Sequence, residues 1–134
     1  WRAYAQSKLA NFYFSLGLSR KLAKANSPIK SYSAHPGLAK TNLQIETAKQ
    51  GGAGKSGKIS EDAVMKFGMS ALDGAMPQLR AALDPKAKSG QFFAPRYFAV
   101  GPAVVRPILR PFTNRAIKKL WALSERETGL KIDI

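Results

Sequence analysis

A tyrosine and a lysine stand four residues apart near the start of the chain, at Tyr4 and Lys8. Side chains at positions i and i+4 of a helix lie on one face and can meet. A positive charge beside a phenol favours the phenolate. A tyrosine in that setting can take a proton from an alcohol or give one to a carbonyl oxygen. The same two side chains could also be plain neighbours on a solvated helix face, and the pair alone leaves both readings open.

A helix over residues 3–25 would hold this pair. Gly17 lies inside it and costs about 1 kcal/mol against alanine, so it predicts close packing against another helix. The segment Asn26-Ser27-Pro28 ends the helix. Large apolar residues recur at spacings close to three and four and give one apolar stripe, which is typical of a core-facing helix: Leu9, Phe12, Tyr13, Leu16 and Leu22.

A short strand over residues 29–34 is predicted next, and Pro36-Gly37 stops it. In open α/β sheets, ligands lie beyond the carboxyl ends of the strands, where this turn would fall. Backbone N–H groups of the turn and the Thr41 hydroxyl could donate hydrogen bonds to a ligand there. Taken alone, Pro-Gly after a strand indicates a turn and no particular function. We expect His35 to be structural.

Two segments resemble signatures of one enzyme family. Residues 4–11 (YAQSKLAN) resemble the Tyr-x-x-x-Lys active-site segment of the short-chain dehydrogenase/reductase family, in a form similar to its retinol dehydrogenase and protochlorophyllide reductase branches. Residues 33–41 (SAHPGLAKT) resemble the family's Pro-Gly-x-x-x-Thr turn. Residues 74–77 and 90–95 continue the likeness. The resemblance covers nearly the whole chain, but only the second half of the family's domain.

The resemblance implies an α/β fold, namely the C-terminal half of a doubly wound, Rossmann-type parallel sheet that is helix-rich over these residues. Residues 1–134 would then be a single partial domain with the N-terminal half absent. The implied activity is hydride transfer between NAD(P)(H) and a carbonyl or alcohol, with Tyr4 as general acid/base. Lys8 would bind the nicotinamide ribose. The nicotinamide would be lined by Pro36, Gly37 and Leu38. Thr41 would lie near the pyrophosphate.

The resemblance also sets expectations for the cofactor and the partners. NADP is the expected cofactor, with NAD as the alternative, and the expected substrate is a small lipophilic carbonyl or alcohol. A homodimer through the first helix is a further expectation. We expect a cytoplasmic protein that can associate with membranes. The family's glycine-rich dinucleotide turn does not occur in these 134 residues, so the chain by itself is expected to lack reductase activity.

The charge of the chain suggests a different function. Its formal net charge is +14, and no acidic residue occurs before Glu46. Such a surplus favours anionic partners. The alternative is therefore a basic fragment that binds an anionic surface without catalysis, with a membrane or an acidic protein more expected than nucleic acid. The chain has no cysteine and one histidine, so no metal site is expected.

The rest of the chain holds further predicted elements. Residues 51–57 (GGAGKSG) form a glycine-rich loop in the expected substrate lid, but a phosphate-binding loop needs glycine at position 49, where lysine stands. A helix capped by Ser60 is expected to break at Asp73-Gly74 and resume over residues 76–83. A second strand is predicted over residues 91–94.

A last helix is predicted from Thr113 or Asn114 to Gly129. Its tryptophan, Trp121, stands among basic residues, which is the composition of a helix that lies on a membrane surface. The basic segment could therefore make a peripheral membrane contact. The alternative is a terminal helix that packs on its own domain with a solvated basic face. The basic residues near Trp121 in this predicted helix are Arg115, Lys118 and Lys119.

Overall fold

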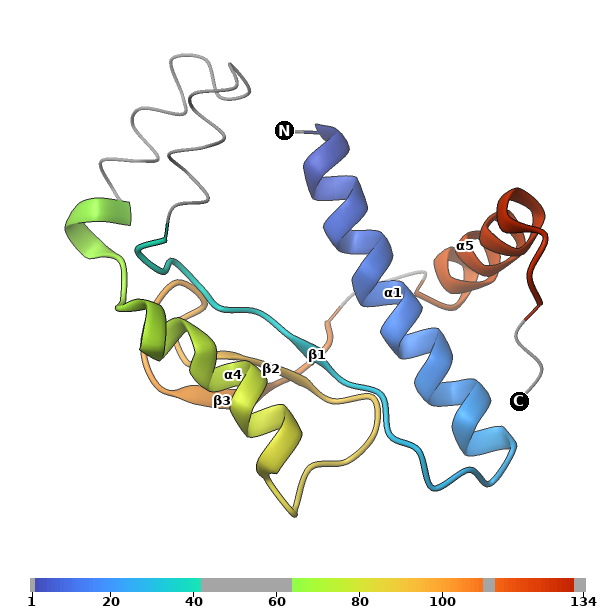
Figure 1. Cartoon of the computed structure of the whole chain (residues 1–134), viewed down its shortest axis with the longest axis horizontal. Coiled ribbons are helices and arrows are strands. Elements are labelled where there is room, and N and C mark those ends of the chain that lie inside the picture. The colour runs from blue at the N-terminus through green and yellow to red at the C-terminus, as the bar shows by residue number, and fades with distance from the viewer. Residues whose placement is uncertain (1, 42–63, 110–112, 132–134) are drawn as a thin grey trace. The chain divides into compact units, whose positions relative to one another are not determined.

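The computed structural model describes residues 2–41, 64–109 and 113–131. Its elements follow the order α1 (Arg2–Lys24), β1 (Ser33–Ala34), α4 (Ala71–Leu83), β2 (Phe92–Pro95), β3 (Ala103–Arg106) and α5 (Thr113–Thr128) (Figure 1). The chain divides into two compact units. We call residues 34–85 and 93–106 the sheet unit, and residues 2–33, 86–92 and 107–134 the two-helix unit.

The three strands form one sheet in the order β1-β2-β3. The Ser33 N–H donates to the Gln91 carbonyl at 3.1 Å, and the His35 N–H donates to the Phe93 carbonyl at 2.9 Å. These partners advance in the same direction, so β1 and β2 are parallel. A turn over residues 96–102 leads into β3 and makes the sheet mixed. The fold is therefore α/β, as predicted. Helix α4 follows β1 and precedes β2 in the sequence and so connects the two parallel strands.

Helix α4 begins earlier than the sequence predicted. Ser70 is its N-cap, and the Ser70 hydroxyl accepts a hydrogen bond from the Asp73 N–H at 3.0 Å. Such a cap satisfies one of the free N–H groups at a helix start. The predicted break at Asp73-Gly74 was wrong, because Asp73 serves the cap. Gly74 lies where α4 crosses the chain closely: a Cβ there would be 2.6 Å from the Cβ of Ala39.

The sheet unit is built around β2. Phe93, Pro77 and Pro95 are its largest fully buried side chains. An isolated parallel bridge joins Ala39 to Met69 and holds the segment after β1 against the residues before α4. The segment after the Pro-Gly turn is thus fixed by backbone pairing.

The two-helix unit is built on the packing of α1 against α5 (Figure 1). The ring of Phe14 stacks on Trp121, with centroids 5.1 Å apart. Gly17 permits the approach, because a Cβ there would lie 2.9 Å from both Ile117 Cγ2 and the Trp121 ring. The prediction of a close helix contact at Gly17 is confirmed. Trp121 is buried, so the tryptophan of the last helix packs inside the two-helix unit.

Several other predictions can be compared with the structure. The predicted strand over residues 29–34 is shorter and comprises only Ser33–Ala34. Strand β3 was not predicted. Residues 64–67 are helical, but the predicted Ser60 cap and the glycine-rich loop lie outside the described residues. Over the ranges that the structure describes, no helix is both long and apolar enough to cross a membrane.

Candidate functional site

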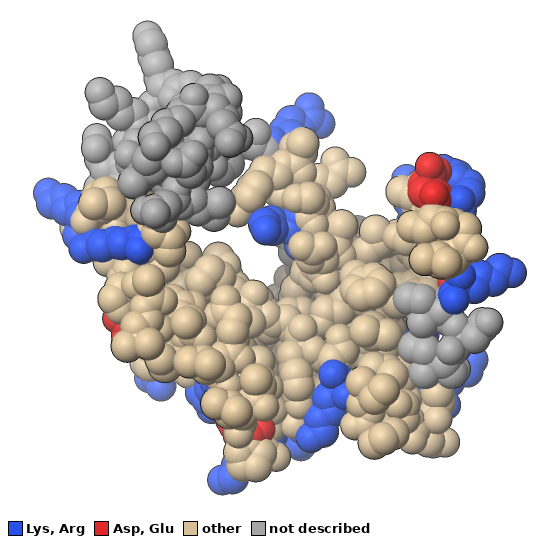
Figure 2. Space-filling model, viewed as in Figure 1, with Lys and Arg blue, Asp and Glu red and all other residues tan. Residues whose placement is uncertain are grey.

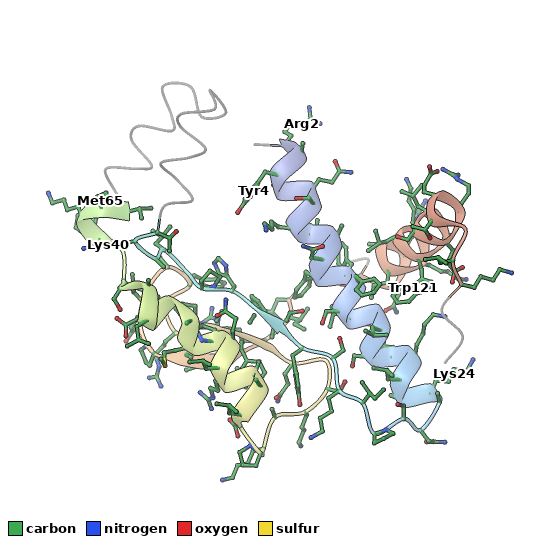
Figure 3. All side chains as sticks on the ribbon, in the orientation of Figure 1. Arg2, Tyr4, Lys24, Lys40, Met65 and Trp121 are labelled. Atoms are coloured by element: carbon green, nitrogen blue, oxygen red, sulfur yellow. The ribbon has the colours of Figure 1, made fainter. Side chains whose placement is uncertain are left out.

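The predicted phenol–ammonium pair meets on the surface of α1. The Lys8 Nζ lies 5.4 Å from the centroid of the Tyr4 ring. Tyr4 is 47% exposed and projects from the start of the helix (Figure 3). The Ser7 hydroxyl donates to the Tyr4 carbonyl at 2.8 Å, a contact within the same helix. Both side chains therefore lie on the exposed surface of the helix.

The C-terminal half of α1 contains buried residues, whereas its first two turns are exposed. Every residue from 2 to 8 is exposed, whereas Leu16, Ser19 and Leu22 are buried. The Ser15 hydroxyl donates to the Tyr32 carbonyl at 2.7 Å, and the Ser89 hydroxyl donates to that of Ser19 at 3.0 Å. One continuous helix thus carries the Tyr4–Lys8 pair on a scaffold that is fixed further along.

The Pro-Gly turn lies against the turn between β2 and β3. Gly37 has a φ of +72°, a conformation that L side chains rarely adopt. A Cβ at this position would also collide with the carbonyl oxygen of Ala99. The Leu38 N–H donates to that same oxygen at 2.7 Å. Glycine is therefore needed here for two reasons, its backbone conformation and the close approach of another chain segment.

The backbone of Leu38 is engaged on both sides. Its carbonyl accepts a hydrogen bond from the Met69 N–H at 2.8 Å, and the Lys40 N–H donates to the Met69 carbonyl at 2.9 Å. A cofactor amide that used the Leu38 N–H would have to share or displace the bond to Ala99. Pro36 is half-buried, and Thr41 is exposed. The Thr41 hydroxyl is thus the more accessible group of this segment.

His35 stands just before the turn. Desolvation by the surrounding protein lowers its pKa from the ordinary value of 6.5. Its backbone N–H donates to the Phe93 carbonyl in the sheet at 2.9 Å, and the residue as a whole is exposed on the surface. The backbone bond fixes His35 at the end of β1, and the structural role of its side chain stays a prediction. Among the described residues, no group of three His, Cys, Asp or Glu side chains is placed to hold a metal ion.

The predicted site residues fall into two groups, one in each unit. Tyr4 and Lys8 belong to the two-helix unit, and residues 36–41 belong to the sheet unit. The first group offers a phenol and an ammonium on one exposed helix face. The second offers an exposed hydroxyl at Thr41 and a glycine turn.

Sequence reasoning missed one further cluster. Arg20, Lys21, Lys118 and Trp121 line a groove between α1 and α5. Gly17 signalled the helix contact, but not which helix would fill it. The Arg20 guanidinium donates to the Asn114 side chain at 2.7 Å across a separation of 94 residues, which no local pattern reveals.

No protein-family model matches the chain. Two curated relatives match a stretch of 42 residues at 55% identity: the chloroplastic short-chain dehydrogenases TIC 32 A and TIC 32 B of Brassica napus. This stretch is 31% of the chain and 13% of each relative. A crystal structure of an uncharacterized protein from Mycobacterium paratuberculosis matches with a TM-score of 0.62 and 28% identity. That match covers 98% of this chain and 40% of the solved one.

These comparisons support an oxidoreductase of the short-chain dehydrogenase type, a family whose members generally use NAD(P). They do not support the narrower retinol dehydrogenase or protochlorophyllide reductase branch. The matched residues span 13% of the length of each relative and 40% of the solved chain.

Proposed function

We propose that this chain carries the proton-transfer residues of a short-chain dehydrogenase, with Tyr4 as general acid/base and Lys8 as its partner. The observation that carries the proposal is the Lys8 ammonium held 5.4 Å from the Tyr4 ring on an exposed helix face. The 42-residue similarity to short-chain dehydrogenases supports the same reaction class.

The chemistry follows from the two side chains. The Tyr4 hydroxyl gives its proton to the carbonyl oxygen of a substrate, or takes a proton from an alcohol in the reverse direction. Proton donation leaves a phenolate on Tyr4. The Lys8 ammonium places a positive charge beside that phenolate, where charge develops during the reaction. A bound nicotinamide would supply or accept the hydride.

We further propose that the residues after β1 help to hold the cofactor. Thr41 presents an exposed hydroxyl that suits a phosphate oxygen, and Lys8 presents donors that suit ribose hydroxyls. Pro36, Gly37 and Leu38 would then border the nicotinamide. The expected substrate is a small lipophilic carbonyl. The expected cofactor is NADP, and a comparison of KM for NADPH and NADH tests this choice directly.

The experiment compares single-residue variants in the polypeptide that carries these residues as the cell makes it. NADPH and NADH oxidation is followed with a panel of aldehydes and ketones. Tyr4→Phe removes the phenol proton and should lower kcat by about a hundredfold or more, because a positioned acid/base contributes about that factor. KM should change little, since the hydroxyl acts in the transition state. Lys8→Met should also lower kcat.

Matched controls lie on the same helix. Tyr13→Phe removes a phenol, and Lys24→Met removes an ammonium, at positions away from the pair. Both should leave kcat unchanged. A second arm places residues 2–41 in a short-chain dehydrogenase of known substrate, in place of its own segment. Activity that survives in this chimera and disappears with Tyr4→Phe supports the proposal; full activity with Tyr4→Phe in either arm overturns it.

A further inference from the structure

The two-helix unit contains an open groove between α1 and α5, with a volume of about 380 Å³. Its apolar lining comes from Ile117, Trp121 and Ala122, together with the backbone at Gly17. Sites for small ligands usually combine an apolar floor with a few polar groups, in volumes from about 300 to 1,000 Å³. The groove has the size and the lining of such a site.

The polar groups of the groove are mostly cationic. Arg20, Lys21 and Lys118 line it, and Glu125 is the one acidic residue of its lining. Arg20 donates to the neutral Asn114 amide, and the Lys21 Nζ lies 5.2 Å from the Trp121 ring. Within the part of the chain that the structure describes, none of these three cations forms an ion pair with a carboxylate. The rim therefore favours a negatively charged group.

The groove is lined in part by the Trp121 indole, whose position in the unit is fixed. The Trp121 Nε1 is buried and has no hydrogen-bond partner among the described residues. Its ring is held on one side by Phe14, whose plane lies 2° from parallel. A buried N–H without an acceptor is unusual in folded proteins. The groove thus has a fixed aromatic surface on one side.

We propose that this groove is a binding site for a small amphiphilic anion that is free in solution, such as a fatty-acid carboxylate. Its acidic head would lie between Arg20 and Lys118, and its apolar body would lie along Ile117 and Trp121. This site goes beyond the proposed oxidoreductase function and uses none of its residues.

The shape of the surface favours a dissolved ligand over a membrane. A helix that lies on a bilayer presents its large apolar residues outward. Here Trp121 is buried and the apolar surface is recessed between two helices. Figure 2 shows blue Lys and Arg atoms spread over separate places on the face drawn, with few red acidic atoms near them. General attraction to polyanions is therefore expected from the whole surface, and the test must separate it from the groove.

The experiment follows the fluorescence of Trp121 in a Trp1→Phe background, where Trp121 is the one remaining tryptophan. Dodecanoate is titrated below its micelle concentration. Dodecanol serves as the neutral probe, and inorganic phosphate serves as an anion without an apolar tail. We expect a saturable fluorescence change with dodecanoate and much weaker effects with the other two. Equal responses to dodecanol and dodecanoate would overturn the role of the rim cations.

Substitutions then separate the groove from the overall charge. Arg20→Gln and Lys118→Gln should each weaken dodecanoate binding by up to about fivefold, the range for exposed ion pairs. Lys24→Gln and Lys119→Gln remove the same charge from the same helices outside the groove and should leave binding unchanged. Ala122→Phe fills the groove without altering the charge and should abolish binding. Far-UV circular dichroism verifies that each variant is folded.

Two outcomes would contradict the proposal. One is equal weakening by groove and control substitutions, which would show attraction to the net positive charge alone. The other is binding confined to vesicles of acidic phospholipid and unaffected by Ala122→Phe, which would identify a membrane-binding surface instead. Neither outcome bears on Tyr4 or Lys8, so the oxidoreductase proposal stands or falls separately.

Discussion

The ring of Phe14 stacks on the indole of Trp121, with ring centroids 5.1 Å apart and ring planes 2° from parallel. This stack joins residues from two helices that are far apart in the sequence. Aromatic pairs in such geometries add to the stabilisation that burial of their area provides. The stack is therefore the main apolar contact that we expect to fix α5 on α1.

Trp121→Ala should destabilise the two-helix unit by about 3 to 5 kcal/mol, the usual range for removing a buried tryptophan. Urea unfolding followed by far-UV circular dichroism measures the change. Leu123→Ala is the control, because Leu123 lies on the same helix and is 43% exposed. Equal effects of the two substitutions would show that Trp121 contributes no more than an exposed residue.

Gly17→Ala has two opposing effects on stability, one from helix propensity and one from packing against α5. Alanine is better than glycine in a helix by about 1 kcal/mol. A methyl group at position 17 would meet Ile117 and Trp121 at 2.9 Å, and overpacking typically costs about 1 to 3 kcal/mol. We expect a net loss of stability in urea unfolding. A gain of stability would show that α5 moves away at little cost.

Gly37→Ala should destabilise the sheet unit more than Gly129→Ala destabilises the end of α5. The two glycines have similar φ values, +72° and +68°. A left-handed backbone costs an alanine about 1 to 2 kcal/mol at either position. Only at Gly37 would the new methyl group also collide with Ala99, whereas a Cβ at Gly129 would have no described side chain or more distant backbone atom within 4 Å. Equal losses in urea unfolding would exclude crowding at the Pro-Gly turn.

Protonation of His35 should destabilise the folded chain. The pKa of His35 is lowered by desolvation, so the unfolded chain binds a proton more readily than the folded one. Stability is then complete above the ordinary value of 6.5 and falls as the pH drops from there toward the lower folded pKa. His35→Gln should remove this dependence. An NMR titration of this single histidine that gives a pKa of 6.5 or higher would contradict the prediction.

Tyr4→Phe should leave stability unchanged to within about 0.5 kcal/mol, because Tyr4 lies on an exposed helix face. Tyr32→Phe is the comparison. The Tyr32 hydroxyl donates to the Ala87 carbonyl at 3.3 Å, and loss of such a bond costs about 0.5 to 1.5 kcal/mol. A large loss of stability with Tyr4→Phe would indicate a structural role for this phenol and would remove the simplest reading of the activity measurement.

Local patterns were sufficient to predict α1, β2 and α5. The apolar stripe of α1 has helical spacing, and Gly129 ends α5 with a φ of +68° and an N–H that donates to Glu125 at 3.0 Å. Strand β3 escaped prediction because its four residues lie beside a proline-broken basic segment. The start of α4 was missed because Gly74 was taken as a helix breaker, whereas the fold needs glycine there to bring α4 close to Ala39.

The candidate site could be predicted only where it is local. Tyr4 and Lys8 are four residues apart on one helix, so their contact follows from helix geometry alone. The pairing of Leu38 with Ala99 and Met69 could not be predicted, because it depends on turns that are distant in sequence. The groove likewise depends on which helix packs on Gly17.

The hydrogen bonds of Leu38 make its peptide groups a point of competition. A ligand that takes the Leu38 N–H as its donor must release the carbonyl of Ala99, which then has to find water or another donor. Since one such bond contributes about 1 kcal/mol, this exchange would weaken the ligand by roughly fivefold. Binding of a ligand to the Leu38 N–H would thus loosen the turn that contains Ala99. Faster amide hydrogen exchange in residues 96–102 would reveal it.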